Sequence, residues 1–257
     1  PKKRGRILDR YGKVLAMSQM QPSVWVNPKE LYQDKAAVQS MATLLGQSPQ
    51  QLAKKLQKNS KKTFLYLARR LDEDLAQKVY GSRIAGLNII EDFARFYPGG
   101  ISASPLIGSV NIDGEGLEGI ELMAQKKLSG EEGYKKVVIN RYGETVQHMG
   151  QAAAKHGEDI ALTIDKNIQY SAYKAVEEGV KEAGAKRGMA VVLDVATGGI
   201  LAAVNYPSFE PADRNVASEL RKNHAFTDLL EPGSTFKPVS MAYVLENHGA
   251  DGAETVN

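Results

Sequence analysis

The sequence predicts an α+β protein built from two domains. Its 257 residues, of which 42% are hydrophobic, are enough to bury one large core or two modest ones. Short strand-like runs, helical patterns and glycine-rich turns follow one another without an internal repeat. The hydrophobic period is then lost over residues 143–158, where small and polar residues collect. We therefore expect a first domain over residues 1–152 and a second over residues 153–257.

The first domain is expected to begin with a β-hairpin and to continue with helices. Residues 5–18 carry apolar residues on both sides of a Tyr11-Gly12 turn, which is typical of a hairpin. Residues 32–80 show helical patterns in three segments, the second of which begins at Ser48 and Pro49. Serine is favoured at the N-cap of a helix and proline at its first position, so this start is well defined.

The second domain is expected to place a helix against an antiparallel sheet. Residues 159–165 alternate as a strand does, and Asp165 can cap the helix that follows. Two buried-strand runs, MAVVLDV and GILAAVNY, flank a short turn at 196–199 and predict a hairpin. A further helix near Ser234 completes the arrangement. In the helix that Asp165 caps, the expected apolar stripe consists of Ile168, Ala172, Ala175, Val176 and Val180.

Composition excludes several classes of function. The chain has 33 Lys and Arg against 30 Asp and Glu, and a net charge of +3 is too small to indicate a nucleic-acid partner. The absence of cysteine excludes disulfides, thiolate metal sites and cysteine nucleophiles, and is compatible with an oxidising compartment. The four histidines lack the spacing of metal ligands, so we expect neither a metal nor another cofactor.

The sequence contains no membrane-spanning or signal segment of its own. No run of residues is long and apolar enough to cross a bilayer. The chain opens with PKKRGR and has no initiator methionine. We therefore expect that an N-terminal segment has been removed.

The segment EPGSTFKP places Ser234 three residues before Lys237 at the start of an apolar helical run. A serine hydroxyl attacks a carbonyl only with a base within hydrogen-bonding reach, and helix positions i and i+3 share a face. A partly desolvated Lys237 could take the proton of Ser234. The Pro232-Gly233 turn would present Ser234 at the helix N-terminus, where free N–H groups favour a developing oxyanion. The alternative is an N-cap serine beside a surface lysine.

A second Ser-x-x-Lys pair, Ser171 and Lys174, shows that the bare pattern is weak. This pair falls in the middle of the helix expected over 166–183. At such a position a serine hydroxyl bonds back to a backbone carbonyl, and the lysine is a solvated surface charge. We expect no catalysis there.

Four segments, in order, resemble the class B penicillin-binding proteins, and Ser-x-x-Lys is the nucleophile motif of that family. The resemblance implies a non-catalytic pedestal domain followed by the first part of a transpeptidase domain with a serine β-lactamase-like fold. The residues of LIGSVNIDGEGLEGIE (106–121), and Glu231 before Pro-Gly, are most similar to the cell-division branch of the family. This branch makes septal peptidoglycan. The segments are RGRILDRYGKVLA (4–16), FARFYPGG with SPLIGSVNIDGEGLEGIE (93–121), LTIDKNIQ with VVLDVATGGILAAVNYPSFEP (162–211), and EPGSTFKP.

The resemblance also implies roles and partners. Ser234 would be the acyl-enzyme nucleophile and Lys237 its general base. Family members bind the D-alanyl-D-alanine end of a stem peptide, release D-alanine and pass the acyl group to an amine on a neighbouring strand, and β-lactams acylate the same serine. The resemblance further implies a single-pass protein of the bacterial inner membrane, anchored by a removed N-terminal segment, with this portion in the periplasm. Its other partners would be a lipid-II polymerase and other division proteins.

The sequence departs from the family after the nucleophile. The Ser-x-Asn and Lys-Thr/Ser-Gly motifs that should follow Ser234 are absent, so we expect this chain to be inactive by itself. Ser109-Val-Asn111 matches the first motif literally but precedes the nucleophile, and we expect a turn or strand end there. Two other functions stay open: an elongation-type class B enzyme, and a penicillin-sensing or scaffolding protein without turnover.

A cluster of charged residues opens the chain. Arg4, Gly5, Asp9 and Arg10 have no nucleophile or base beside them. We expect these residues to be structural and to join segments of the pedestal by charged hydrogen bonds.

Overall fold

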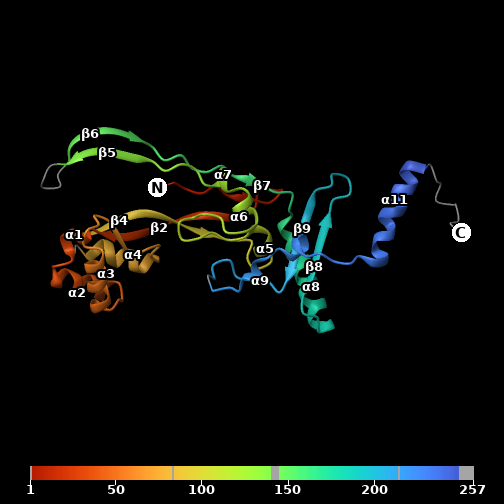
Figure 1. Cartoon of the computed structure of the whole chain (residues 1–257), viewed down its shortest axis with the longest axis horizontal. Helices are drawn as coiled ribbons and strands as arrows, with labels where there is room; N and C mark the ends of the chain where they lie inside the picture. Colours follow the sequence, from red (N-terminus) through yellow and green to blue (C-terminus); the bar gives the residue numbers. More distant parts are fainter. Residues whose placement is uncertain (1, 83, 140–144, 214, 249–257) are drawn as a thin grey trace. The chain divides into compact units, whose positions relative to one another are not determined.

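The computed structural model describes residues 2–82, 84–139, 145–213 and 215–248 (Figure 1). The chain divides into two compact units, Pro1–Ala225 and Phe226–Asn257. The first unit contains both strands and helices, so the expected α+β class is confirmed.

A five-stranded sheet is built around β2 in the first unit. β4 pairs antiparallel with β2 over ten residues, β3 pairs with the last residues of β2, and β1 pairs with the first. β7 extends the sheet by pairing parallel to β1. The β1–β2 hairpin confirms the expectation for residues 5–18, and its turn uses Gly12 at φ 78°, which glycine adopts without strain. The strands are β1 (Ile7–Leu8), β2 (Val14–Val26), β3 (Leu65–Ala68), β4 (Leu87–Phe96) and β7 (Ile160–Ala161).

Four helices gather near the end of the β2–β4 pair where β3 lies (Figure 1). Their apolar faces and those of β2 and β3 bury a core that includes Val24, Met41, Leu52, Leu56 and Val79. Burial of this apolar surface is the main source of stability for this end of the unit. The helices are α1 (Pro28–Leu31), α2 (Lys35–Leu44), α3 (Pro49–Lys58) and α4 (Glu73–Ser82).

The helical pattern of residues 32–80 is confirmed in three places and interrupted in one. α2, α3 and α4 match the three expected segments. The strand β3 lies between α3 and α4 and was not predicted, because four residues are too few to show a period. Ser48 is the N-cap residue of α3 and Pro49 is its first residue, but the Ser48 side chain makes no capping hydrogen bond.

A second buried core lies where β1, the start of β2 and three short helices meet. It includes Ile7, Leu15, Ile107, Leu128 and Ile164, each at most 3% exposed. Ile164 follows β7, so a segment far along the chain completes a core that the first residues begin. The helices are α5 (Ser104–Ile107), α6 (Gly119–Met123) and α7 (Gln125–Leu128).

β5 (Tyr134–Ile139) and β6 (Thr145–Ala152) form a separate two-stranded antiparallel ribbon. The stretch over 143–158 that loses its hydrophobic period, where we place the domain boundary, includes the strand β6. Residues 143 and 144 lie outside the described residues. A ribbon with both faces in water needs no apolar period, and Val146 and Met149 are accordingly about two-thirds exposed. The domain boundary placed between residues 152 and 153 stays a prediction.

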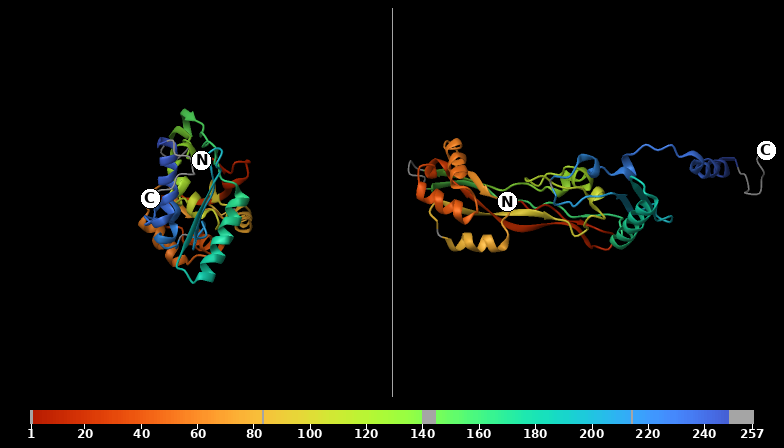
Figure 2. Two further views of the ribbon diagram at one scale, coloured as in Figure 1. Left: turned by 90° about the vertical axis from the view of Figure 1, so that its right-hand side faces the viewer. Right: turned by 90° about the horizontal axis from the view of Figure 1, so that it is seen from below.

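α8 (Lys166–Ala183) lies along the antiparallel hairpin of β8 (Gly188–Leu193) and β9 (Ile200–Tyr206), as Figures 1 and 2 show. The expected helix and hairpin are therefore confirmed. Asp165 caps α8 as predicted: its Oδ1 accepts hydrogen bonds from the backbone N–H groups of Asn167 at 2.8 Å and Ile168 at 3.4 Å. The expected strand over 159–165 is reduced to the two residues of β7.

The buried face of α8 differs in part from the predicted stripe. Val180 is buried as expected, but Ala175 is exposed, and Gln169 and Tyr173 are buried instead. The Gln169 amide is satisfied on both sides, since it donates to the carbonyls of Ser102 and Ala203 and accepts from the Ala203 N–H, all at 2.8 Å. A polar side chain that finds all its partners can be buried without a penalty, which a hydrophobic pattern cannot reveal.

Two short helices, α9 (Ser218–Arg221) and α10 (His224–Thr227), follow the hairpin. The second unit contains the 3₁₀ turn η1 (Gly233–Phe236) and the helix α11 (Lys237–His248). None of the helices in the described ranges has the length and apolar character that crossing a membrane requires.

Candidate active site

Ser234 lies inside η1, and Lys237 is the first residue of α11. Gly233 has φ 53° and makes the sharp entry that Pro232-Gly233 predicts. The Lys237 backbone N–H donates to the Ser234 carbonyl, so the turn continues directly into the helix. Side chains three residues apart in a 3₁₀ turn are eclipsed, which places Ser234 and Lys237 on the same side of the chain.

The α-helix itself begins three residues after Ser234 rather than at it. Pro238 sits in the first turn of α11, where the missing N–H of proline costs nothing. Within η1, the Thr235 backbone N–H and hydroxyl both donate to the Pro232 carbonyl, the former at 3.1 Å. The expected position of Ser234 at a helix start is thus met by a 3₁₀ turn that leads into the helix.

The Ser234 and Lys237 side chains are both exposed. Among the described residues, no hydrogen bond joins the Ser234 hydroxyl to the Lys237 amine. The desolvation that a lysine base requires is therefore not supplied by the described part of Phe226–Asn257. The apolar residues of α11 are exposed as well, with Val239 at 57% and Tyr243 at 63%.

The second Ser-x-x-Lys pair lies on the solvent side of α8. Lys174 Nζ contacts a Glu177 carboxylate oxygen at 2.7 Å, and Lys181 contacts the other at 2.9 Å. Ser171 is exposed. Lys174 is thus the surface charge that the sequence predicts.

The cluster at the start of the chain surrounds a buried carboxylate, Glu121 on α6. Arg4 Nε contacts Glu121 Oε2 at 2.6 Å, and Arg95 Nε of β4 contacts Oε1 at 2.7 Å. All three side chains are at most 6% exposed. The Arg95 guanidinium also donates to the Gly5 carbonyl at 2.7 Å. These bonds join the N-terminal segment, β4 and α6, which confirms the structural role expected for Arg4.

Gly5 and Asp9 contribute to the same junction by different means. A side chain at Gly5 would come within 1.9 Å of the Glu158 carbonyl, so only glycine fits this close approach of two backbones. Asp9 is fully buried and accepts from the N–H groups of Tyr11 and Lys13 at 2.8 Å and of Lys166 at 3.2 Å. Burial alone would raise the pKa of Asp9, but these donors outweigh it and hold the pKa below its ordinary value of 3.8.

The Ser109-Asn111 segment is placed as expected, whereas the partner of Arg10 lies outside the pedestal segments that it was expected to join. Arg10 Nη2 lies 4.0 Å from Asp194 Oδ2 and is partly exposed. The Asn111 side chain holds a turn by accepting from the N–H groups of Asp113 and Glu115 at 2.8 and 3.0 Å. Ser109 donates to Glu118 at 2.5 Å. Ser-x-Asn is a structural turn here.

Sequence reasoning did not single out Glu121 and Arg95, the partners of Arg4. Their segments were noted for their resemblance to a family, but no local pattern pairs residues 4, 95 and 121 across such separations. No cluster of His, Asp and Glu suited to a metal ion occurs within the described ranges.

Two family models match separate parts of the chain. Residues 1–162 match the family model described as the Penicillin-binding Protein dimerisation domain, and residues 188–257 match the Penicillin binding protein transpeptidase domain.

Three curated relatives carry names that describe their activity. The chain is 40% identical over 247 residues to the "Probable peptidoglycan D,D-transpeptidase PbpC" of Pseudomonas aeruginosa, which covers 95% of this chain and 44% of the relative. It is 36% identical over 263 residues to the "Probable peptidoglycan D,D-transpeptidase PenA" of Neisseria meningitidis, covering 100% and 45%. It is 33% identical over 250 residues to the "Peptidoglycan D,D-transpeptidase FtsI" of Escherichia coli, covering 95% and 42%. The chain spans less than half the length of these relatives.

A solved structure shares the fold. A peptidoglycan synthetase from Bifidobacterium adolescentis superposes with a TM-score of 0.67 at 23% identity, covering 97% of this chain and 50% of the other.

Proposed function

The chain belongs to the penicillin-binding proteins, and on that premise we propose that it carries the nucleophile of a peptidoglycan D,D-transpeptidase, with Ser234 as the acylated serine and Lys237 as its general base. The observation that carries the proposal is EPGSTFKP, inside a segment that matches the transpeptidase model, with its serine and lysine on one side of a 3₁₀ turn. The names of the relatives at 33–40% identity support the same reaction.

The first half of the reaction would form an ester. Ser234 Oγ attacks the carbonyl carbon between the last two residues of a stem peptide ending in D-Ala-D-Ala, and its proton passes to the neutral Lys237 amine. The peptide C–N bond then breaks, the proton goes to the departing nitrogen, and D-alanine leaves. The remaining acyl group is bonded to Ser234.

The second half would release the product. An amine on a neighbouring stem peptide attacks the ester carbonyl and loses a proton, Ser234 Oγ regains one, and a new amide bond cross-links the two strands. A β-lactam would enter by the same first step, because opening of its ring leaves an ester on Ser234. Its leaving nitrogen stays tethered to the acyl group.

This chain alone supplies only part of the machinery. Ser234 and Lys237 are exposed, and no Ser-x-Asn or Lys-Thr/Ser-Gly sequence follows them. A general base works best when its pKa lies near the working pH. For a lysine, this requires shielding from water. We infer that residues beyond those present here complete the oxyanion and substrate sites, and that this chain by itself turns over slowly or not at all.

The biological setting we propose is septal cell-wall synthesis. FtsI is among the relatives, and the sequence of residues 106–121, together with Glu231, resembles the cell-division branch. In that setting the protein would be anchored in the inner membrane with this portion in the periplasm, and would work with a lipid-II polymerase and other division proteins. An elongation role predicts rounded cells on depletion, whereas a septal role predicts filaments.

Covalent labelling tests the catalytic assignment. The full-length protein is incubated with a penicillin and digested, and the drug mass is located by mass spectrometry. We expect one adduct on the peptide containing Ser234, and none in Ser234→Ala. Ser171→Ala is the matched control, since it removes the serine of the other Ser-x-x-Lys pair and should leave labelling unchanged. A drug mass on another residue, or on none in a folded protein, would overturn the assignment.

A turnover assay separates an enzyme from a penicillin sensor. The full-length protein is supplied with a donor and an acceptor stem peptide, and the cross-linked product is followed together with released D-alanine. An enzyme forms product over many cycles, whereas a sensor stops after one equivalent. Lys237→Ala should lower acylation and turnover by at least 10²-fold if Lys237 is the base.

A further inference from the structure

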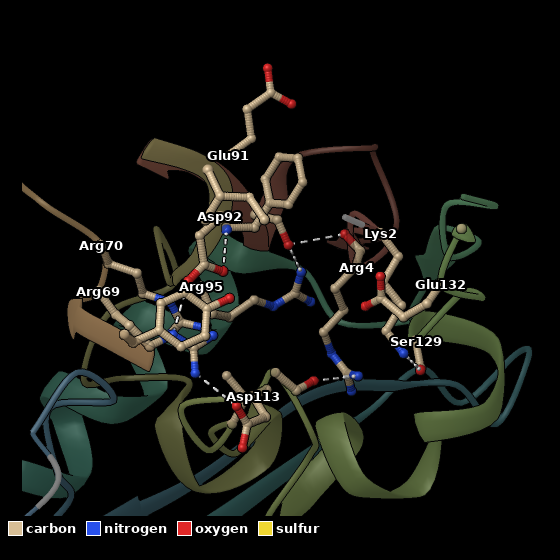
Figure 3. Close-up of a pocket in the computed structure, with 17 residues that line it drawn as sticks. Lys2, Arg4, Arg69, Arg70, Glu91, Asp92, Arg95, Asp113, Ser129 and Glu132 are labelled. Carbon is tan, nitrogen blue, oxygen red and sulfur yellow. Dashed lines mark hydrogen bonds and ion pairs between the residues drawn. The ribbon is translucent and has the colours of Figure 1, made fainter. Parts of the chain in front are cut away.

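An arginine-rich pocket in the first unit contains a donor that its surroundings do not satisfy. The pocket has a volume of about 460 Å³ and lies among β2, β4, the start of the chain and the loop that precedes α6. Its lining includes Arg4, Arg69, Arg70 and Arg95 (Figure 3). It is remote in sequence from Ser234, and nothing in the proposed reaction uses it.

Arg95 is the deepest of these arginines, with a side chain only 3% exposed. Its Nε is bonded to Glu121, and its Nη1 donates to the Gly5 carbonyl at 2.7 Å and the Ser18 hydroxyl at 3.3 Å. Its Nη2 is buried and has no hydrogen-bond partner among the described residues. Figure 3 shows the Arg95 guanidinium extending toward that of Arg4. A buried guanidinium donor without a partner costs free energy that a bound acceptor would recover.

The charge at the base of the pocket is also unbalanced. Arg4 and Arg95 share the single carboxylate of Glu121, so two buried cations face one buried anion. The remaining donors of Arg4 go to neutral acceptors: the carbonyls of Glu121 and Gly114, and the Gln125 side chain. An excess buried charge is costly unless a further anion pairs with it.

The other acidic residues in the lining do not supply that anion. Asp92 and Asp113 both contact Arg69, at 3.1 and 2.7 Å. Glu132 is exposed, and Figure 3 shows Glu91 directed away from the arginines. Arg70 donates to the Ile112 carbonyl.

We propose that this pocket binds an oxyanion, the carboxylate or phosphate group of a small ligand, which accepts a hydrogen bond from Arg95 Nη2 between Arg4 and Arg69. A planar guanidinium suits both groups, because its parallel N–H bonds match two oxygens of a carboxylate or phosphate. The volume falls within the range of small-molecule sites, so the pocket has room for the rest of such a ligand.

Titration calorimetry on the whole chain tests the proposal. Inorganic phosphate and citrate are titrated separately, at constant ionic strength set with sodium chloride. We expect saturable binding of at least one of them. Binding of phosphate alone indicates a phosphate-bearing ligand, and binding of citrate alone indicates a carboxylate-bearing one. If neither anion binds above the chloride reference, the proposal is wrong.

Two variants locate the site without touching the arginine network. Ile90→Trp fills the pocket from β4 and should weaken anion binding at least tenfold. Glu132→Gln removes an exposed negative charge from the lining and should strengthen binding about twofold. Glu178→Gln, an exposed change on α8, is the matched control and should have no effect.

Arg95→Lys is the direct test, and it should abolish binding if the variant folds by circular dichroism. Should it fail to fold, Ile90→Trp and Glu132→Gln still decide the matter. Anion binding that neither of these two variants changes would place the ion elsewhere and overturn the proposal.

Discussion

The buried charges around Glu121 and the exposed pair of Ser234 and Lys237 are held in opposite ways. Arg4, Arg95 and Glu121 come from three distant segments and are at most 6% exposed. Ser234 and Lys237 are three residues apart, their relation is set by one local turn, and both lie in water. The first group joins distant segments and so stabilises the fold. The relative position of Ser234 and Lys237, by contrast, is set by their own turn and needs no contact with distant segments.

This difference distinguishes the structural role of the buried group from the chemical role that we propose for Ser234 and Lys237. Removing a member of the buried group leaves uncompensated charge in a low-dielectric interior. Removing a member of the exposed pair changes only groups that water already solvates. Stability measurements should therefore respond strongly to the first kind of change and hardly at all to the second.

Glu121→Ala should have the largest effect on stability. It leaves the buried guanidinium groups of Arg4 and Arg95 without their shared carboxylate, and breaking such a buried pair costs about 3–5 kcal/mol. Urea unfolding followed by circular dichroism would measure the loss. Glu178→Ala, an exposed change on α8, is the control and should stay within about 0.5 kcal/mol of the parent. Equal stability of Glu121→Ala and the parent would remove the contrast between the two regions.

Asp165→Ala tests a local interaction of intermediate strength. It deletes the side chain that accepts from the first N–H groups of α8, and loss of such a cap costs about 1 kcal/mol. Asp165→Asn keeps an acceptor in place and should recover most of that loss. The same urea titration compares the two variants. An asparagine as damaging as alanine would indicate that the charge of Asp165, rather than its capping bond, matters.

Local features of this fold could be predicted from the sequence, and non-local ones could not. The hairpin at Gly12, the cap at Asp165 and the β8–β9 hairpin each depend on a few neighbouring residues with well-defined preferences. The burial of Gln169 depends on carbonyls 34 and 67 residues away, and β3 exists only because β2 offers it an edge. Such partners leave no periodic signal.

The candidate site divides in the same way. Ser234 and Lys237 were singled out because their Ser-x-x-Lys spacing follows a Pro-Gly turn and because the segments around them resemble a family, whereas the spacing alone also occurs at Ser171 and Lys174. Arg95 and Glu121 were not singled out, because a salt bridge between residues 26 apart has no local pattern. The exposure of Lys237 could not be predicted either, since shielding comes from whatever packs against the turn, which the turn's own sequence does not specify.

Acid should weaken the sheet region through Asp92 on β4. Burial raises the pKa of this carboxyl, but hydrogen bonds from Ser23, Arg69 and the Phe93 N–H outweigh it and hold the pKa below its ordinary value of 3.8. The ionised form is therefore favoured by folding, so its contribution is present above about pH 4 and is lost as the pH falls through the lower, folded value.

The measurement is urea unfolding at pH 6 and pH 3 for the parent and for Asp92→Asn. We expect the parent to lose more stability on acidification than the variant, by up to about 1 kcal/mol. Glu178→Gln is again the control, because its exposed carboxyl should leave the acid response unchanged. Identical pH dependence in parent and Asp92→Asn would mean that other carboxylates account for the acid sensitivity.

Ser234→Ala should have the smallest effect on stability of all. The Ser234 hydroxyl is exposed and makes no hydrogen bond within the described part of the chain, so its loss should change the free energy of unfolding by less than about 0.5 kcal/mol. In the full-length protein the same change should abolish β-lactam labelling. A residue that is neutral for folding and indispensable for acylation has a chemical role, whereas a destabilising Ser234→Ala would favour the alternative of a capping serine. The comparison with Glu121→Ala, which should destabilise the chain, would then separate the two regions by measurement.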